Sequence, residues 1–226
     1  MIALTVATPD YADMAHENAM WFKRNSGLDT MVVHVSANSL REGFETKLSL
    51  DKLVNGKVVF FDSDYRLVKD VRGVIHGWKM GGGFIGVHEP SASKGDDRFF
   101  SFHDPRELGI PTKTHINTGF FACDTSKAIV KRVFADARQI FHEKTNGLWG
   151  QINDQTDQTI LNFAIHRHRA MVHLKDSAWN WFYYAFREGW CEFPQEVIGL
   201  HAAGVFGAQA KREHLEHGTK FLGIPR

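Results

Sequence analysis

Three apolar segments among the first 61 residues alternate with helical segments, and this alternation constrains the fold more than any other feature. Ile2–Ala7, Thr30–Val35 and Val58–Phe61 are rich in β-branched and aromatic residues, a composition typical of buried strands. Residues 12–25 and 46–54 separate them and have the apolar spacing of helices. Strands that alternate with helices predict an α/β fold in which a mostly parallel central sheet is flanked by helices.

The rest of the chain has fewer recognisable elements. The predicted elements are a strand at His115–Asp124, helices over residues 125–143 and at Asp157–Arg167, and a short strand at Met171–Leu174. The segment from Val71 to Pro111 and the tail after Gly204 give no clear pattern.

The composition limits the class of protein. A chain of 226 residues with 43% hydrophobic residues can bury a substantial core, and we expect one domain over residues 1–226. The formal net charge of +1 argues against a protein that coats nucleic acid. Cys123 and Cys191 have neither zinc-site spacing nor a disulfide framework, and the N-terminus does not resemble a signal peptide. The cysteine usage favours the reducing cytosol, so we expect a cytoplasmic protein, and no apolar stretch is long enough to span a bilayer.

Two aspartates directly follow the third predicted strand. Asp62 and Asp64 flank Ser63, and if the extended conformation continues to residue 64, both carboxylates project to the same side. Carboxylates that close repel each other unless a cation lies between them, and oxygen ligands of this kind suit Mg²⁺ or Mn²⁺. The alternative is structural, because Asp62 or Ser63 could cap a helix that begins near Tyr65. In parallel sheets ligands bind beyond the carboxyl ends of the strands, so we expect Thr8–Tyr11 to share a cleft with the aspartates.

Four segments resemble, in order, the motifs of nucleotide-sugar-dependent glycosyltransferases with the GT-A fold. They are VVFFDSD at residues 58–64, NTGFF at 117–121, DQTILN at 157–162 and HAAG at 201–204. The likeness is greatest to the retaining galactosyl- and glucosyltransferases of glycosyltransferase family 8, which include glycogenin and bacterial lipooligosaccharide galactosyltransferases. It implies a Rossmann-like GT-A domain with a nucleotide-binding half over residues 2–70, an acceptor and sugar half over 71–204, and a tail over 205–226.

The resemblance implies a metal site and a nucleotide-sugar donor. Asp62, Asp64 and His201 would hold Mn²⁺, or Mg²⁺, against the diphosphate of a donor that we expect to be a UDP-sugar. Such a cation stabilises the negative charge that develops on the leaving diphosphate. Asp62 would also bind the ribose. Gly204 closes the late histidine motif, and Lys211 is the candidate for the lysine that contacts the diphosphate, although it comes later than in the family.

Further nucleotide and sugar contacts are implied at four positions. Thr8 and Tyr11 lie where the family holds the base; the Tyr11 ring could stack on uracil, or it could simply pack where the first helix begins. Asn117 and Gly119 would lie near the transferred sugar, since a glycine lets the backbone approach a ligand closely.

The resemblance also implies a catalytic pair, Asp157 and Gln158. Asp157 would hydrogen-bond sugar hydroxyls, and Gln158 would lie beneath the anomeric carbon and polarise it, which predicts retention of the anomeric configuration. The segment NDQTDQTILN contains the dipeptide twice, so Asp154 and Gln155 are the alternative pair if Asp157 is only a helix cap. We choose the later pair because Leu161-Asn162 follows it in register.

These features predict a metal-dependent glycosyltransferase that moves a sugar from a nucleotide-diphospho-sugar to an acceptor. The sequence leaves open whether that acceptor is a glycan, a protein, a small molecule or a modified nucleic acid. Trp179–Arg187 could stack on bases, but such a segment is more typical of a core. One alternative is a haloacid-dehalogenase-like phosphatase that uses Asp62 and Asp64, although Arg66 stands where that class has threonine or valine. Another is a GT-A-like binding protein without catalytic activity.

Overall fold

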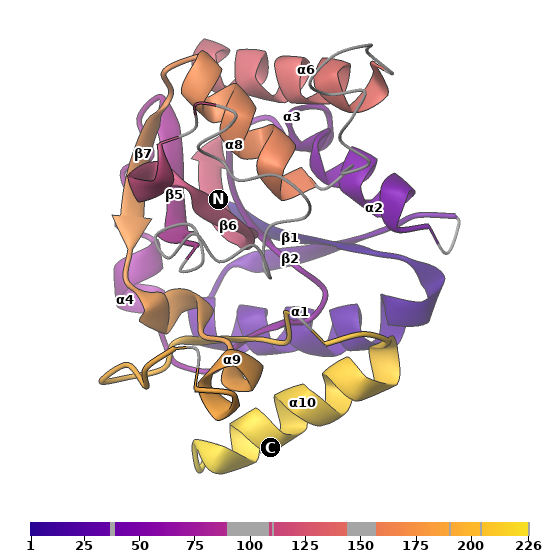
Figure 1. Cartoon of the computed structure of the whole chain (residues 1–226), viewed down its shortest axis with the longest axis vertical. Coiled ribbons are helices and arrows are strands. Elements are labelled where there is room, and N and C mark those ends of the chain that lie inside the picture. Colours follow the sequence, from indigo (N-terminus) through magenta and orange to yellow (C-terminus); the bar gives the residue numbers. More distant parts are fainter. Residues whose placement is uncertain are drawn as a thin grey trace.

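The centre of the computed structural model is a mixed sheet with the strand order β2-β1-β3-β6-β5-β7 (Figure 1). The structure describes residues 1–36, 39–89, 109, 111–143, 157–189, 191–203 and 205–225. Among these residues the strands of the sheet are β1 (Ile2–Ala7), β2 (Asp29–His34), β3 (Lys57–Phe61), β5 (Gly83–His88), β6 (Ile116–Asp124) and β7 (Met171–Lys175). All run in the same direction except β6, which pairs antiparallel with β3 and β5. The predicted α/β fold with a mostly parallel sheet is therefore confirmed.

The first elements follow the sequence prediction closely. α1 (Ala12–Ser26) connects the parallel strands β1 and β2. Phe22 of α1 is buried and stacks on Phe61 of β3, with ring centroids 4.5 Å apart. The helix ends at Gly27, whose φ of 70° is left-handed and whose N–H donates to the carbonyl of Lys23. Because β1, β2 and β3 are parallel, their carboxyl ends lie at one edge of the sheet.

The single helix predicted over residues 46–54 is wrong, because the chain forms two shorter helices. They are α2 (Leu40–Lys47) and α3 (Leu50–Leu53). Ser49, with φ −108° and ψ 17°, leaves the helical conformation between them. The break lets Leu48 and Leu50 both enter the core, whereas residues two positions apart in one helix face different sides.

A second, two-stranded sheet joins distant parts of the chain. β4 (Tyr65–Leu67) pairs antiparallel with β8 (Gly199–His201), and Tyr65 lies opposite His201. The Tyr65 hydroxyl donates to the carbonyl of Trp179 at 2.7 Å. The alternative of a capped helix beginning near Tyr65 is therefore wrong, and a late segment of the chain lies beside the end of β3.

Several elements were outside the prediction, while α6 (Ala128–His142), α8 (Asp157–Arg167) and β7 confirm it. Among the described residues the unpredicted elements are β4, β5, β8, α4 (Arg72–Ile75), α9 (Tyr183–Arg187), α10 (Ala208–Phe221) and the short 3₁₀ helices η1 (Pro9–Tyr11), η3 (Thr112–Thr114) and η4 (Ser177–Asn180). Glycines hide β5 in the sequence because they weaken strand propensity. Gly86 is nevertheless required, since a Cβ there would lie 2.8 Å from the side chain of Ile116.

Helices cover both faces of the central sheet (Figure 1). On one face Phe60 and Phe121 pack with Phe134 of α6 and with α8. On the other face Phe61 and Phe120 pack with residues of α1 and α4. Neighbouring residues of β3 and β6 thus enter opposite cores, as the alternation of side chains along a strand requires.

Most of the aromatic segment Trp179–Arg187 is buried. Trp179, Trp181 and Phe182 are buried, and the Trp179 ring stacks on Phe120 with centroids 5.9 Å apart. The structural interpretation of this segment is confirmed, and these three rings form no exposed surface for stacking bases.

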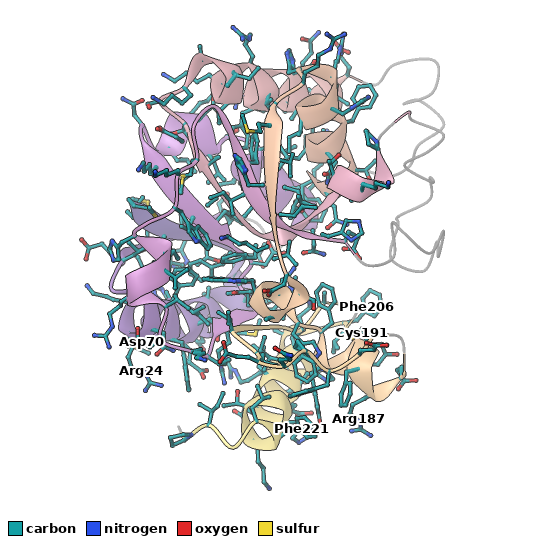
Figure 2. The ribbon with its side chains drawn as sticks, turned by 90° about the vertical axis from the view of Figure 1, so that its left-hand side faces the viewer. Arg24, Asp70, Arg187, Cys191, Phe206 and Phe221 are labelled. Carbon is teal, nitrogen blue, oxygen red and sulfur yellow. The ribbon has the colours of Figure 1, made fainter. Side chains whose placement is uncertain are left out.

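The last helix, α10, packs against the small sheet. Its Leu215 is buried in a cluster with Leu200 of β8 and Tyr183 of α9. The loop that leads into it carries Phe206, which is 93% exposed and lies at the surface in Figure 2. Among the described residues no helix combines the length and the apolar character needed to cross a membrane.

Candidate active site

A turn after β3 positions the two aspartates. The Tyr65 N–H donates to the carbonyl of Asp62, and the Asp62 N–H donates to the carbonyl of Gly119 in β6, both at 2.9 Å. The carbonyl of Ser63 accepts from the Asn18 side chain of α1 at 2.7 Å. The expectation that an extended conformation aligns the carboxylates is therefore wrong, because the chain turns here to enter β4.

His201 of β8 completes a triangle with these carboxylates. Its Nε2 lies 3.3 Å from Oδ1 of Asp64 and 3.7 Å from Oδ2 of Asp62. The ligand atoms of the three residues all lie within 4.8 Å of one another. Gly119 makes room for the imidazole, since a Cβ there would be 2.2 Å from Cε1 of His201. The absence of a side chain at Gly119 thus leaves room for the histidine, and the predicted approach of a ligand to this glycine stays a prediction.

This triangle fits a divalent cation. Metal–ligand bonds of about 2.1 Å at right angles place neighbouring ligand atoms about 3.0 Å apart, and the two separations from His201, 3.3 and 3.7 Å, need only a small contraction. Two carboxylates and one imidazole suit Mn²⁺ better than Ca²⁺, which prefers ligand sets made only of oxygens. Asp64 and His201 are buried, whereas the Asp62 side chain is one-third exposed. The Asp62, Asp64 and His201 set is therefore a candidate metal centre at the carboxyl edge of the sheet.

Lys47 links this centre to α8. Its ammonium lies 2.6 Å from Oδ2 of Asp157, 3.0 Å from Oδ1 of Asp62 and 3.3 Å from the hydroxyl of Thr118. Burial alone would lower the pKa of Lys47, but Asp157 and Asp62 outweigh it and raise that pKa. Lys47 therefore stays charged and holds the carboxylates of two separate motifs together.

Lys211 reaches the centre from the first turn of α10. Its ammonium contacts Oδ2 of Asp64 and lies 6.0 Å from the centroid of the Tyr11 ring. Burial would raise the pKa of Asp64, but Lys211 and His201 lower it well below its usual range.

The carbonyl of Thr8 accepts from the Tyr11 N–H at 2.9 Å, so both residues belong to one turn after β1. Thr8–Tyr11 and the aspartates thus meet at one edge, as expected.

Asp157 and Gln158 begin α8, and their side chains meet β6. Oδ2 of Asp157 accepts from the Thr118 hydroxyl at 2.8 Å, and Oε1 of Gln158 accepts from the Thr118 N–H at 3.1 Å. Asn162 secures this arrangement, because its amide accepts from the N–H and donates to the carbonyl of Ile116, at 2.9 and 2.8 Å. The alternative pair Asp154-Gln155 lies outside the described residues, as does Gly204.

Glu89 follows β5 and joins the same network. Its Oε2 accepts from the amide of Asn117 at 2.6 Å and from the amide of Gln158 at 3.3 Å. Oδ1 of Asn117 accepts from the Gly119 N–H and from the Asn180 amide, both at 2.9 Å. Asn117 is buried, and these bonds fix its orientation.

Sequence reasoning did not identify Lys47, Thr118 or Glu89. The signal for Glu89 resembles that for Asp62, because both are acids that directly follow a strand. Several carboxylates in one site also require a compensating cation, but nothing in the sequence singles out Lys47 among the 27 lysines and arginines.

Comparison with known proteins identifies the fold. No protein-family model matches the chain, and no curated protein matches it. The WbbM bifunctional glycosyltransferase superposes with a TM-score of 0.68 and 14% identity over 92% of this chain and 46% of WbbM. The galactosyltransferase LgtC, solved with donor and acceptor sugar analogues, gives 0.66 and 14% over 100% of this chain and 98% of LgtC. A glycosyltransferase involved in glycosylation of the major capsid of PBCV-1 gives 0.60 and 12% over 96% and 100% of the two chains.

These likenesses, at such low identity, show the fold. The chain has the α/β fold of the GT-A glycosyltransferases, and the resemblance that the sequence motifs indicate is confirmed at that level. It spans less than half of WbbM but nearly all of LgtC. Within this fold Asp62 and Asp64 form an Asp-x-Asp arrangement, and His201, from the last of the four sequence motifs, completes the candidate metal centre.

Proposed function

We propose that the chain is a metal-dependent glycosyltransferase that transfers a sugar from a nucleotide-diphospho-sugar, with uridine as the base, and retains the anomeric configuration. The observation that carries the proposal is the triangle of Asp62, Asp64 and His201, joined through Lys47 to Asp157 at the start of α8. This arrangement combines a candidate cation site with the nearby carboxylate of Asp157 and amide of Gln158, in the fold of enzymes such as LgtC.

The metal centre is assigned to the donor diphosphate. A bound Mn²⁺ or Mg²⁺ supplies positive charge where the diphosphate departs. Asp62, Asp64 and His201 would hold that ion, and Lys211 would bind a phosphate oxygen. Tyr11 and Thr8 would bind the base, and Asp62 would also bind the ribose. Gly204 would contribute its backbone to the binding of the diphosphate.

The transferred sugar is assigned to the space beside α8. Asp157 would accept hydrogen bonds from sugar hydroxyls, and Asn117 and Gly119 would line the same space. Gln158 would lie beneath the anomeric carbon, and the Glu89 carboxylate next to it favours positive charge developing on the sugar. A structure of an LgtC active-site mutant replaces a glutamine by glutamate, so a glutamine also lies in that active site.

The remaining assignments follow the same proposal. We treat residues 1–226 as one domain, and the acceptor remains a glycan, a protein, a small molecule or a modified nucleic acid.

Cys123 is a buried thiol, and the Cys191 thiol donates to the carbonyl of Phe182, which agrees with the proposed cytoplasmic location. The phosphatase alternative loses its basis with the GT-A fold, whereas an inactive binding protein is an outcome that the following assay detects.

The test is release of nucleoside diphosphate from a panel of nucleotide sugars, with Mn²⁺ and with water or added sugars as acceptor. We expect one uridine-diphospho-sugar to react, and Gln158→Leu to slow the reaction at least tenfold. Gln139→Leu is the matched control, because Gln139 lies on the exposed side of α6 and bonds only to Glu143 among the contacts described for it. Nucleotide binding without turnover of any donor would favour the inactive binding protein.

A further inference from the structure

The two lysines of the candidate metal centre are held very differently. Lys47 contacts two carboxylates and a hydroxyl, and its side chain is 5% exposed. Among the described residues Lys211 contacts one carboxylate, Asp64, and its side chain is 18% exposed. Lys47 therefore has the contacts of a fixed structural cation, whereas Lys211 has one ion pair to give up within the described part of the chain.

Asp64 divides its two oxygens between different partners. Oδ1 faces His201 in the candidate metal triangle, and Oδ2 contacts the ammonium of Lys211. A divalent cation bound to Oδ1 would share the Asp64 carboxylate with this ammonium, and like charges that close repel appreciably at a partly buried site. Lys211 in its present position thus competes with a cation for the charge of Asp64.

A diphosphate offers Lys211 another partner. Phosphate oxygens carry concentrated negative charge, and a lysine ammonium on its flexible stem binds them as a point charge. The ammonium already lies 6.0 Å from the ring centroid of Tyr11, on the side where the base is assigned. Since the backbone of Lys211 is fixed in α10, where its N–H donates to the carbonyl of Gly207, rotation of the side chain is sufficient for the exchange.

We propose that Lys211 exchanges between Asp64 and the diphosphate of the donor, so that it opposes binding of the metal ion alone and favours binding of metal ion and nucleotide together. The inference rests on the proposed function. Lys211 acts here as a positioning residue that couples two ligands, because each ligand changes the partner available to it. The coupling distinguishes Lys211 from Lys47, which keeps Asp62 and Asp157 paired throughout.

The test measures binding of Mn²⁺ alone, by the electron paramagnetic resonance signal of the free ion, and binding of uridine diphosphate in saturating Mn²⁺, by calorimetry. In Lys211→Met we expect the affinity for Mn²⁺ alone to rise about tenfold and the affinity for uridine diphosphate to fall at least tenfold. Lys220→Met removes the same charge from an exposed position of α10 and should change neither affinity. Lys211→Arg keeps the charge and should keep Mn²⁺ binding weak.

Tighter binding of Mn²⁺ alone together with weaker binding of uridine diphosphate in Lys211→Met is the signature of exchange. An unchanged or weaker affinity for Mn²⁺ in Lys211→Met would overturn it, because Lys211 would then support the metal ligands or be neutral toward them. That result, with wild-type protein still binding Mn²⁺ and uridine diphosphate, would leave the proposed function intact. If neither wild type nor Lys211→Met binds Mn²⁺ or uridine diphosphate, the proposed function fails and the exchange fails with it.

Discussion

Replacing Lys47 with methionine should strongly destabilise the protein, because it leaves buried carboxylates without their counter-charge. The Lys47 and Asp157 side chains are 5% and 7% exposed, and the ammonium lies 2.6 Å from Asp157 and 3.0 Å from Asp62. Removing one partner of a buried ion pair typically costs about 3–5 kcal/mol. Thr118 still donates to Asp157, and the Asp62 side chain is one-third exposed, so we expect the lower part of that range, about 3 kcal/mol.

Urea unfolding followed by tryptophan fluorescence measures this cost, and a double variant isolates its cause. Lys47→Met/Asp157→Asn removes both charges, so we expect it to recover at least about 1 kcal/mol relative to Lys47→Met. The reasoning is refuted if Lys47→Met unfolds within about 1 kcal/mol of wild type, or if the double variant is no more stable than the single one.

Two further predictions concern Gly119 and His115. Gly119→Ala should displace the His201 ring, destabilise the fold by about 1–3 kcal/mol and weaken Mn²⁺ binding at least tenfold in calorimetry. Gly73→Ala is the control, because a Cβ there meets nothing within 4 Å, and it should leave Mn²⁺ binding unchanged. Normal Mn²⁺ binding in Gly119→Ala would contradict the geometry. Burial, helped by His88, lowers the pKa of His115 to about 4 from the 6.5 of the unfolded chain, so stability present above pH 6.5 should be lost as the pH falls toward 4. Between pH 7 and pH 5 this loss is about 2 kcal/mol in urea unfolding, and a His115→Phe variant that keeps the full pH dependence would refute the assignment.

The sequence predicts the elements whose patterns are local. β1, α1, β3 and α8 are long or strongly apolar, and their limits agree with the prediction within a residue or two. β5 escapes because Gly83 and Gly86 interrupt its strand pattern, and these glycines reflect close contacts with β7 and β6 that sequence alone does not reveal. The break between α2 and α3 escapes for a similar reason, because it exists to bury Leu48 and Leu50 together.

The candidate site likewise contains residues that the sequence predicts and residues that it does not. Asp62, Asp64 and His201 belong to recognisable motifs, and the structure brings them together. The mechanism of their convergence was not predictable, since it depends on the pairing of β4 with β8 across most of the chain. Lys47 belongs to no motif, and its role exists only because α2 carries its ammonium to Asp62 and Asp157.

The most direct test of the central claim is calorimetric titration of uridine diphosphate into the protein with and without Mn²⁺, for wild type and Asp64→Asn. Asparagine keeps the shape of Asp64 but loses the charge that a cation needs, and Asp70→Asn is the control, because Asp70 is exposed and pairs with its neighbour Arg72. The account predicts binding that requires Mn²⁺, is abolished or weakened at least a hundredfold in Asp64→Asn and is unchanged in Asp70→Asn. Binding that is independent of Mn²⁺ or equally tight in Asp64→Asn, or no binding in wild type, would contradict it.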